Sequence, residues 1–568
     1  MTAPSAYSRP SMAAPLLVVA GLALAVLAWT LPVNLKSVSP ALLREAGQGT
    51  PSLAAFGKSL VDSEKIGPSA LVLEAARSVN DPGTAGLETA LKDLSAHQPE
   101  MVAWGGWDPF LDPLFNLRES KVQTASTPVL NFFLPEKARG TLRAYLVNSR
   151  SLGVQALLRT RDIQATGRFV PVSRPGGQPL EAVILLTALL YQGEHLSPAL
   201  QREVRGLAES AASRQNLGEL EPFFLDVLSL GKRLDWAQLA ELLRRTGDTK
   251  TVGEYAHLAR MAPEQFPLIY VAALFSGSAD RVASYLIQYG KTGMEDLRLA
   301  LANGQGAVNQ LMLRQVPVNH ALNAGIGTAA SLVMLHPKAM LVLKYLGYLL
   351  GAYLVFRGLD LWIVSPTTGA SLHLPRMKSG ALALLFAALL IIVTEPFLLK
   401  AAPPSEYRVR LVLPALVITS TNPVQAADKT IQTMDSSTLI SIGFFALLQV
   451  AMYVTCLMKI REIARSAVSP LVKLRLMENE ENLFDGGLYV GIGGTATALV
   501  LQVLGIIEPN LLAAYSSNLF GITCVAFVKI RSVRPYKRQL ILDSQTVTPV
   551  YSTPVGTGGK AGISPVVT

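Results

Sequence analysis

Two threonines lie in the middle of a long uncharged segment, where a hydroxyl group meets few polar partners. Residues 487–507 carry no charged side chain and are long enough for one helix to cross a bilayer, with Thr495 and Thr497 near the centre. Such hydroxyls could face a polar group or pathway inside the membrane. The segment also contains a cluster of glycines, Gly491, Gly493 and Gly494, which favours close packing of a neighbouring helix. The residues alone leave both interpretations open.

Three ionisable residues in other apolar segments are candidates for a function. Arg357 and Asp360 lie near one end of residues 339–364, three positions apart, so that they could pair on one helix face. Glu395 lies near the end of residues 380–399 and could be a carboxylate in an ion pathway or could extend to the membrane surface. Because a charge inside a bilayer is costly, each is a candidate functional residue.

The composition predicts an integral membrane protein. Of 568 residues, 50% are hydrophobic and only 16% are charged. Six segments reach or approach the length of a membrane span: 14–33, 339–364, 380–399, 437–458, 487–507 and 511–530. The first could be a cleaved signal peptide, but its length and the lack of a clean cleavage motif favour an uncleaved anchor. The predicted fold class is an all-α integral membrane protein with about six transmembrane helices and a large, mainly helical extracytoplasmic domain.

Lysine and arginine set the expected orientation, because they are enriched in short cytoplasmic loops. The connection 459–486 and the segment after the last span are basic and are placed in the cytoplasm with both termini, in a multi-pass protein of the inner (cytoplasmic) membrane. The net charge of +10 fits such flanks, and nucleic acid is not an expected partner. The expected organisation is a membrane anchor or signal segment (1–33), an extracytoplasmic domain (34–338), two transmembrane helices (339–399), an extracytoplasmic loop (400–436), a three-span core (437–540) and a disordered cytoplasmic tail (541–568).

Helix start and stop signals recur in the extracytoplasmic domain. Ser197 precedes a proline, and Asp235 is followed three residues later by Gln238, as in a capping box. Ser278 could begin a helix that ends at Gly290. These signals predict an irregular set of short helices, with a solenoid as the alternative. Such a domain would be a docking surface for periplasmic or envelope proteins, or a spacer.

Signatures of catalysis and of cofactor or metal binding are missing from the sequence. Cys456 and Cys524 lie in apolar segments and form no metal-binding motif, and the histidines are scattered. The GKT sequence at 290–292 lacks the earlier glycine of a P-loop, because Tyr285 stands at that position. We therefore expect a protein that is not an enzyme and that uses no cofactor or metal.

Residues 437–540 resemble the MotA/TolQ/ExbB proton-channel family. An inward-running helix is followed by a basic connection and a tight outward and inward hairpin. The sequence GIGGTATALV (491–500) is similar to the glycine-rich segment that opens the family's middle span, and AAYSSNLFGI (513–522) is similar to its ALxTTLxGL segment in the last span. The chain differs in its short cytoplasmic connection, in Ser-Asn instead of Thr-Thr, and in the spans and external domain that precede this core.

The resemblance implies which residues are functional. Thr495 matches the polar threonine of the middle span, and Ser517 and Asn518 stand at the threonine pair of the last span. Gly521 matches the glycine that follows this pair, so helix packing is expected there as at the three earlier glycines. In the family these hydroxyls line a pore beside an aspartate on the single helix of a partner such as MotB, TolR or ExbD. Thr497 is included with them as a candidate for the ion pathway.

The resemblance also implies a function and partners. We expect an inner-membrane subunit of an ion-driven complex that transduces energy to the cell envelope, with the proton as the expected ion. It would form a homo-oligomer and surround a single-span partner that supplies an intramembrane Asp. The alternative is a non-conducting membrane scaffold whose helical external domain, residues 34–338, binds envelope proteins.

Overall fold

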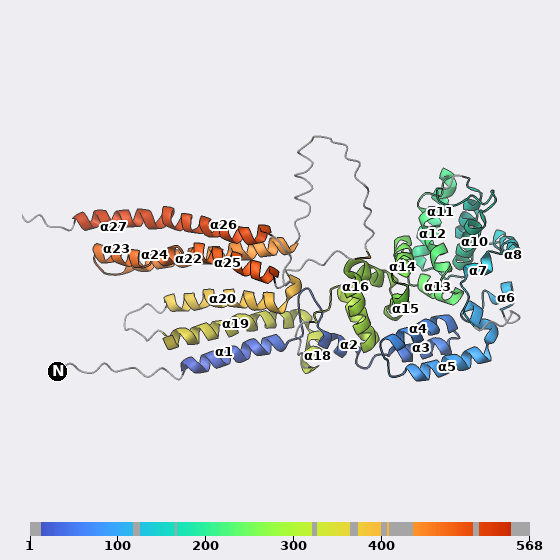
Figure 1. Cartoon of the computed structure of the whole chain (residues 1–568), viewed down its shortest axis with the longest axis horizontal. Helices are drawn as coiled ribbons and strands as arrows, with labels where there is room; N and C mark the ends of the chain where they lie inside the picture. Colours follow the sequence, from blue (N-terminus) through green and yellow to red (C-terminus); the bar gives the residue numbers. More distant parts are fainter. Residues whose placement is uncertain are drawn as a thin grey trace, which may run out of the picture. The chain divides into compact units, whose positions relative to one another are not determined.

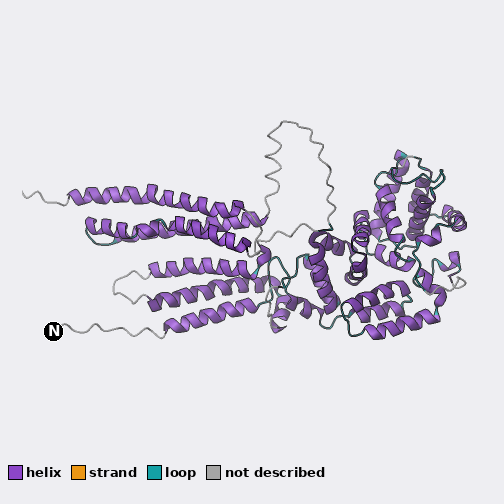
Figure 2. Cartoon of the chain, viewed as in Figure 1, coloured by secondary structure: helices purple, strands orange, loops and turns teal. Residues whose placement is uncertain are grey.

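The computed structural model describes residues 13–117, 125–164, 167–320, 327–363, 373–398, 406–407, 436–503 and 511–546. Within these ranges the regular structure is helical, without strands (Figure 2). Three helices are long and apolar enough to cross a membrane: α1 (Ala13–Thr30), α19 (Pro337–Ile363) and α22 (Ser436–Arg465), all drawn in Figure 1. The chain is thus an all-helical protein with three candidate membrane-spanning helices, which indicates a multi-pass membrane protein.

Three further apolar helices occupy the other segments expected as spans. They are α20 (His373–Thr394), α25 (Gly486–Val503) and α26 (Leu511–Phe527). Their described apolar stretches are shorter than a typical span, so their assignment as spans belongs to the function proposed below. The expected loop 400–436 and tail 541–568 lie largely outside the described residues.

The residues form two compact units, each described here by itself. The first unit comprises Met1–Val19, Ala352–Ala388 and Asn422–Thr568. The second unit comprises Ala20–Gly351 and Leu389–Thr421.

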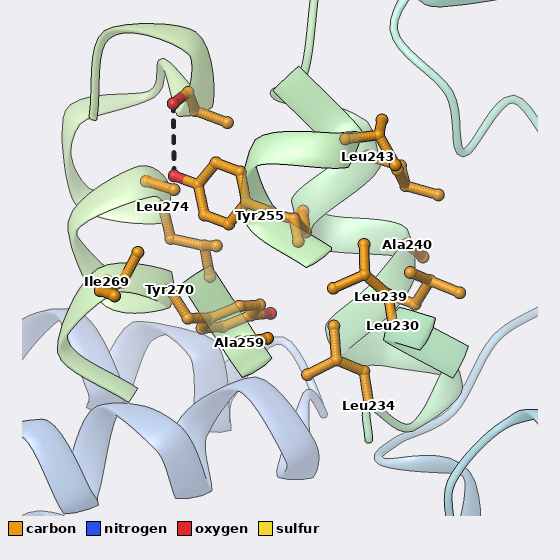
Figure 3. Close-up of a cluster of buried hydrophobic side chains, with 14 of the residues drawn as sticks. Leu230, Leu234, Leu239, Ala240, Leu243, Tyr255, Ala259, Ile269, Tyr270 and Leu274 are labelled. Carbon is orange, nitrogen blue, oxygen red and sulfur yellow. Dashed lines mark hydrogen bonds between the residues drawn. The ribbon is translucent and has the colours of Figure 1, made fainter. Parts of the chain in front are cut away.

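Most of the second unit is a helical domain built around two mainly apolar helices that are buried on every side. In α10 (Gln178–Gln192) every residue from Leu180 to Leu190 is buried, and in α15 (Phe266–Ser276) every residue from Phe266 to Phe275 is buried. Figure 3 shows part of this core, where α15 faces leucines of neighbouring helices and where Tyr255 Oη donates a hydrogen bond to the carbonyl oxygen of Ala279 at 3.3 Å.

The surrounding helices are short, as the sequence predicts. They are α2 (Pro40–Gly47), α3 (Leu53–Asp62), α4 (Ile66–Ser78), α5 (Thr84–His97), α6 (Asp112–Phe115), α7 (Leu130–Phe133), α8 (Glu136–Val147), α9 (Leu152–Arg159), α11 (Pro198–Arg214), α12 (Leu220–Gly231), α13 (Trp236–Leu243), α14 (Thr249–Met261), α16 (Ala279–Asn303), α17 (Gln305–Arg314) and α18 (Gly327–Leu335).

The predicted helix boundaries of this domain are confirmed where the structure shows caps. The Ser197 side chain accepts a hydrogen bond from the Leu200 amide, and Asp235 and Gln238 form a complete capping box at the start of α13. Gly290 adopts φ +56° and breaks α16 at the expected position.

Within the first unit, α22, α25 and α26 pack together, and more polar helices follow them. Helix α26 runs without interruption through the π-helical turn η6 (Val528–Val533) into α27 (Arg534–Thr546). At 1.5 Å per residue, this rod is about 54 Å long, whereas the hydrocarbon core is about 30 Å thick. The C-terminal part of the rod, α27, packs against α23 (Pro470–Asn479), which precedes α24 (Glu481–Phe484). The basic connection between the spans is therefore a helical structure rather than an open loop.

Candidate functional sites

Helices α25 and α26 meet at their glycines. A Cβ atom built on Gly521 would lie 2.6 Å from the carbonyl oxygen of Gly487, and one built on Gly491 would lie 3.0 Å from that of Ser517. At Gly494, the added atom would lie 2.3 Å from Ser517 Oγ. Only glycine fits these three positions without a shift of backbone or side chain, so Gly491, Gly494 and Gly521 form a close helix contact.

Polar side chains fill this contact. Ser517 is fully buried, and its Oγ donates to the carbonyl oxygen of Gly491 at 3.2 Å. Gln449 of α22 is 5% exposed, and its Nε2 donates to the carbonyl oxygen of Gly487 at 3.1 Å. Asn518 is half-buried beside them, and its Oδ1 has no hydrogen-bond donor in the described part of the chain. The sequence analysis missed Gln449, although an amide in the middle of an apolar segment is itself a signal.

The threonines of α25 divide between its two faces. Thr495 is half-buried, and its Oγ1 donates to the carbonyl oxygen of Gly491 at 3.0 Å. Thr497 is exposed and donates to the carbonyl oxygen of Gly493 at 2.8 Å. Gly493 differs from its expected packing role, because an added Cβ would meet no atom within 4 Å. The helical turn of 100° per residue places Gly493 and Thr497 away from the face that meets α26.

These glycines give a matched stability test. We expect Gly521→Ala to lower the free energy of unfolding by about 1–3 kcal/mol, because its methyl group must displace the backbone of α25. Gly493→Ala should be neutral or stabilising, since alanine is the better helix former and has open space there. Unfolding of the full chain in mixed micelles with rising SDS, followed by circular dichroism, measures both. An equal loss in the two variants would contradict the contact.

A buried lysine of the second unit lies at the N-terminal part of α19. The Lys344 side chain is 2% exposed, and its Nζ donates to the carbonyl oxygen of Val33 and to Asn34 Oδ1, both at 2.7 Å. Glu395 Oε1 lies 3.9 Å from Nζ. The ammonium group therefore has two oxygen acceptors and one carboxylate around it, which offsets the cost of burying its charge.

The carboxylate of this pair is also buried and hydrogen-bonded. Glu395 is 1% exposed, accepts from Tyr345 Oη at 2.8 Å through Oε1, and accepts from the Leu35 amide at 2.9 Å through Oε2. The expected alternative, a side chain extending to the surface, is therefore wrong for Glu395, because its partners hold it inside the second unit. Lys344 was not predicted, although a lysine inside an apolar segment marks such a site.

The other two predicted charges do not pair as expected. Asp360 accepts a hydrogen bond from Ser379 Oγ of α20. No ion pair joins Asp360 to Arg357 within the described residues, because the carboxylate is directed toward the neighbouring helix instead of along its own.

The helical domain of the second unit also buries the carboxylate of Asp235. Asp235 accepts from the Gln238 amide at 2.8 Å and from Ser126 Oγ at 2.7 Å. Cβ atoms built on Gly67 and Gly105 would lie 2.1 and 2.3 Å from its oxygens, so two glycines leave the room that this carboxylate occupies. Burial raises the pKa of Asp235 to about 7, against the opposing effect of its hydrogen bonds.

Together, the fold and the buried polar groups indicate the class of this protein. It is an all-helical, multi-pass membrane protein with a large helical domain. Comparison with family models, with curated proteins and with solved structures finds no match for this chain.

Proposed function

We propose that the chain is a MotA/TolQ/ExbB-like subunit of an ion-driven complex in the inner membrane, acting on the cell envelope. In this proposal α20, α25 and α26 join the three long apolar helices as spans, both termini lie in the cytoplasm, and several copies surround a single-span partner. The helical domain of residues 34–338 would reach envelope proteins.

One observation carries the proposal: two adjacent helices without an interior carboxylate hold polar groups at comparable depth. Asn518 packs at Gly491, where its Cα would lie 3.3 Å from an added Cβ, and Thr495 lies one turn further along α25. Asn518 Oδ1, which has no donor among the described residues, is an acceptor in low dielectric. A partner's carboxylic acid would donate to it when protonated and would accept from the Asn518 amide when ionised; the Thr495 hydroxyl would join as a donor by releasing the carbonyl oxygen of Gly491.

A second candidate, the non-conducting scaffold, is favoured by Ser517. Its complete burial and its bond to the carbonyl oxygen of Gly491 are what helix packing alone requires. In this view the polar groups stabilise the contact between α25 and α26, and only the external domain makes functional interactions.

Ion flux decides between the two candidates. In vesicles containing the chain and its single-span partner, we expect Thr495→Val to lower proton flux at least tenfold, because valine keeps the shape and removes the hydroxyl. Thr455→Val is the matched control, since Thr455 of α22 also bonds to the carbonyl four residues earlier but lies outside the α25–α26 contact. Equal flux in the wild type and Thr495→Val would remove this residue from the pathway, and no flux in any variant would favour the scaffold.

A further inference from the structure

A groove runs between α22 and α26 within the first unit. It has a volume of about 500 Å³ and is lined by one face of α22, from Ala446 to Tyr453, and by one face of α26, from Phe520 to Phe527, with Arg531 of η6 at one end. The rings of Tyr453, Phe520 and Phe527 give it a largely aromatic wall. Such a groove on apolar helices is suited to a planar side chain from another membrane helix.

One polar atom in this groove lacks a partner. Gln449 lines the groove and is 5% exposed, yet its Oε1 has no hydrogen-bond donor among the described residues. This oxygen is enclosed beside Gly487, so the side-chain amide must turn toward the groove to meet an occupant. A buried acceptor without a donor is costly in low dielectric. The occupant that fits therefore carries an aromatic ring and a hydrogen-bond donor, which describes tyrosine and does not describe a lipid chain.

The chain itself offers such a side chain on the opposite face of α25. Tyr489 is 59% exposed, and its hydroxyl makes no hydrogen bond within the described residues. It stands two residues from Gly487 and Gly491, which face α26, so the helical turn directs Tyr489 away from its own groove. Gly493 lies one turn further on this face, where open space would let another helix approach.

The depths of Tyr489 and of the groove agree. Gln449 and Gly487 are hydrogen-bonded and therefore lie at one level. From that level Tyr489 lies two residues, or about 3 Å, along α25, and Ala446 lies three residues, or about 4.5 Å, in the same direction along the antiparallel α22. A second copy related by rotation about the membrane normal would present its Tyr489 at the height of the groove.

We propose that Tyr489 of one copy inserts into the α22–α26 groove of the next copy and donates a hydrogen bond to Gln449 Oε1. The two surfaces differ, so the contact is head-to-tail and closes a ring of copies. The inference rests on the homo-oligomer of the proposed function, but it does not require that the ring conduct ions.

Disulfide cross-linking of the full chain in native membranes tests this contact. In a Cys456→Ala, Cys524→Ala background, one tagged copy carries Tyr489→Cys and a differently tagged copy carries Ala446→Cys. We expect mixed dimers on oxidation only when both copies are present, because the two positions differ in depth by about 1.5 Å. Val500→Cys replaces Tyr489→Cys in the control: it lies on the same exposed face but about 15 Å away in depth, and should give no cross-link.

Several results would overturn the contact. One is the absence of mixed dimers although both cysteines react with a maleimide and are therefore accessible. Another is an equal yield of mixed dimers when Val500→Cys replaces Tyr489→Cys. A third is the formation of dimers by the Tyr489→Cys copy alone. An anionic lipid retained in the groove while mixed dimers fail to form would identify the other occupant.

Energy transfer between labelled copies measures the hydrogen bond. Tyr489→Phe and Gln449→Leu should each weaken association about threefold, and the double variant should lose no more than either single change. Full additivity would exclude the pairing. Proton flux tests the proposed function separately. Mixed dimers without proton flux would support the contact between copies and contradict conduction. Proton flux without mixed dimers would overturn the contact and leave the proposed function standing.

Discussion

Replacing Lys344 with methionine is expected to lower the free energy of unfolding by about 3–5 kcal/mol, because it leaves the buried Glu395 carboxylate without a compensating charge. The lysine also holds the chain that leaves α1, through its bonds to Val33 and Asn34. Methionine has a similar length and is apolar, so the packing volume is nearly kept. Unfolding in mixed micelles with rising SDS, followed by circular dichroism, measures the loss.

The double variant isolates the charge. In Lys344→Met combined with Glu395→Gln, no unpaired charge remains, and we expect at least half of the lost stability to return. Lys338→Met is the control, because this lysine lies in the same helix and is exposed. If the double variant were as unstable as the sum of its single changes, the bonds to Val33 and Asn34 would account for the loss instead of the ion pair.

Raising the pH from 4 to 8 is expected to remove up to about 4 kcal/mol of stability through Asp235 alone. Its pKa in the folded chain, about 7, lies above the usual value of 3.8, so the folded state binds this proton more tightly than the unfolded state. The contribution to stability is complete below pH 4 and is lost as the pH rises through 7. At 1.36 kcal/mol per pH unit, the difference between the two pKa values gives this magnitude.

The measurement compares Asp235 with asparagine. Asparagine can still accept the capping hydrogen bond from the Gln238 amide, but it does not titrate. Urea unfolding at a series of pH values, followed by the fluorescence of the neighbouring Trp236, should show a weaker dependence on pH in Asp235→Asn. Asp108 does not interfere in this range, because hydrogen bonds from His195 and Trp236 outweigh its burial and lower its pKa to about 2. The same slope in both proteins would show that Asp235 stays ionised throughout.

Local sequence patterns predicted the helix boundaries well. The cap at Ser197, the capping box at Asp235 and the break at Gly290 depend on side chains and backbone angles within one turn, so residues three or four positions apart suffice to predict them. These features needed no knowledge of which helices become neighbours.

The sequence by itself also determined that apolar helices carry glycines and polar groups, but the tertiary structure decided which of them meet. Gly491, Gly494 and Ser517 face a neighbouring helix, whereas Gly493 and Thr497 face away, because the rotation of α25 against α26 is set by packing between distant segments. The Lys344–Glu395 pair joins residues 51 positions apart. Its other partners, Val33 and Asn34, lie 311 and 310 positions before Lys344 in the sequence. Such contacts follow from how helices are stacked, which periodicity along one helix does not encode.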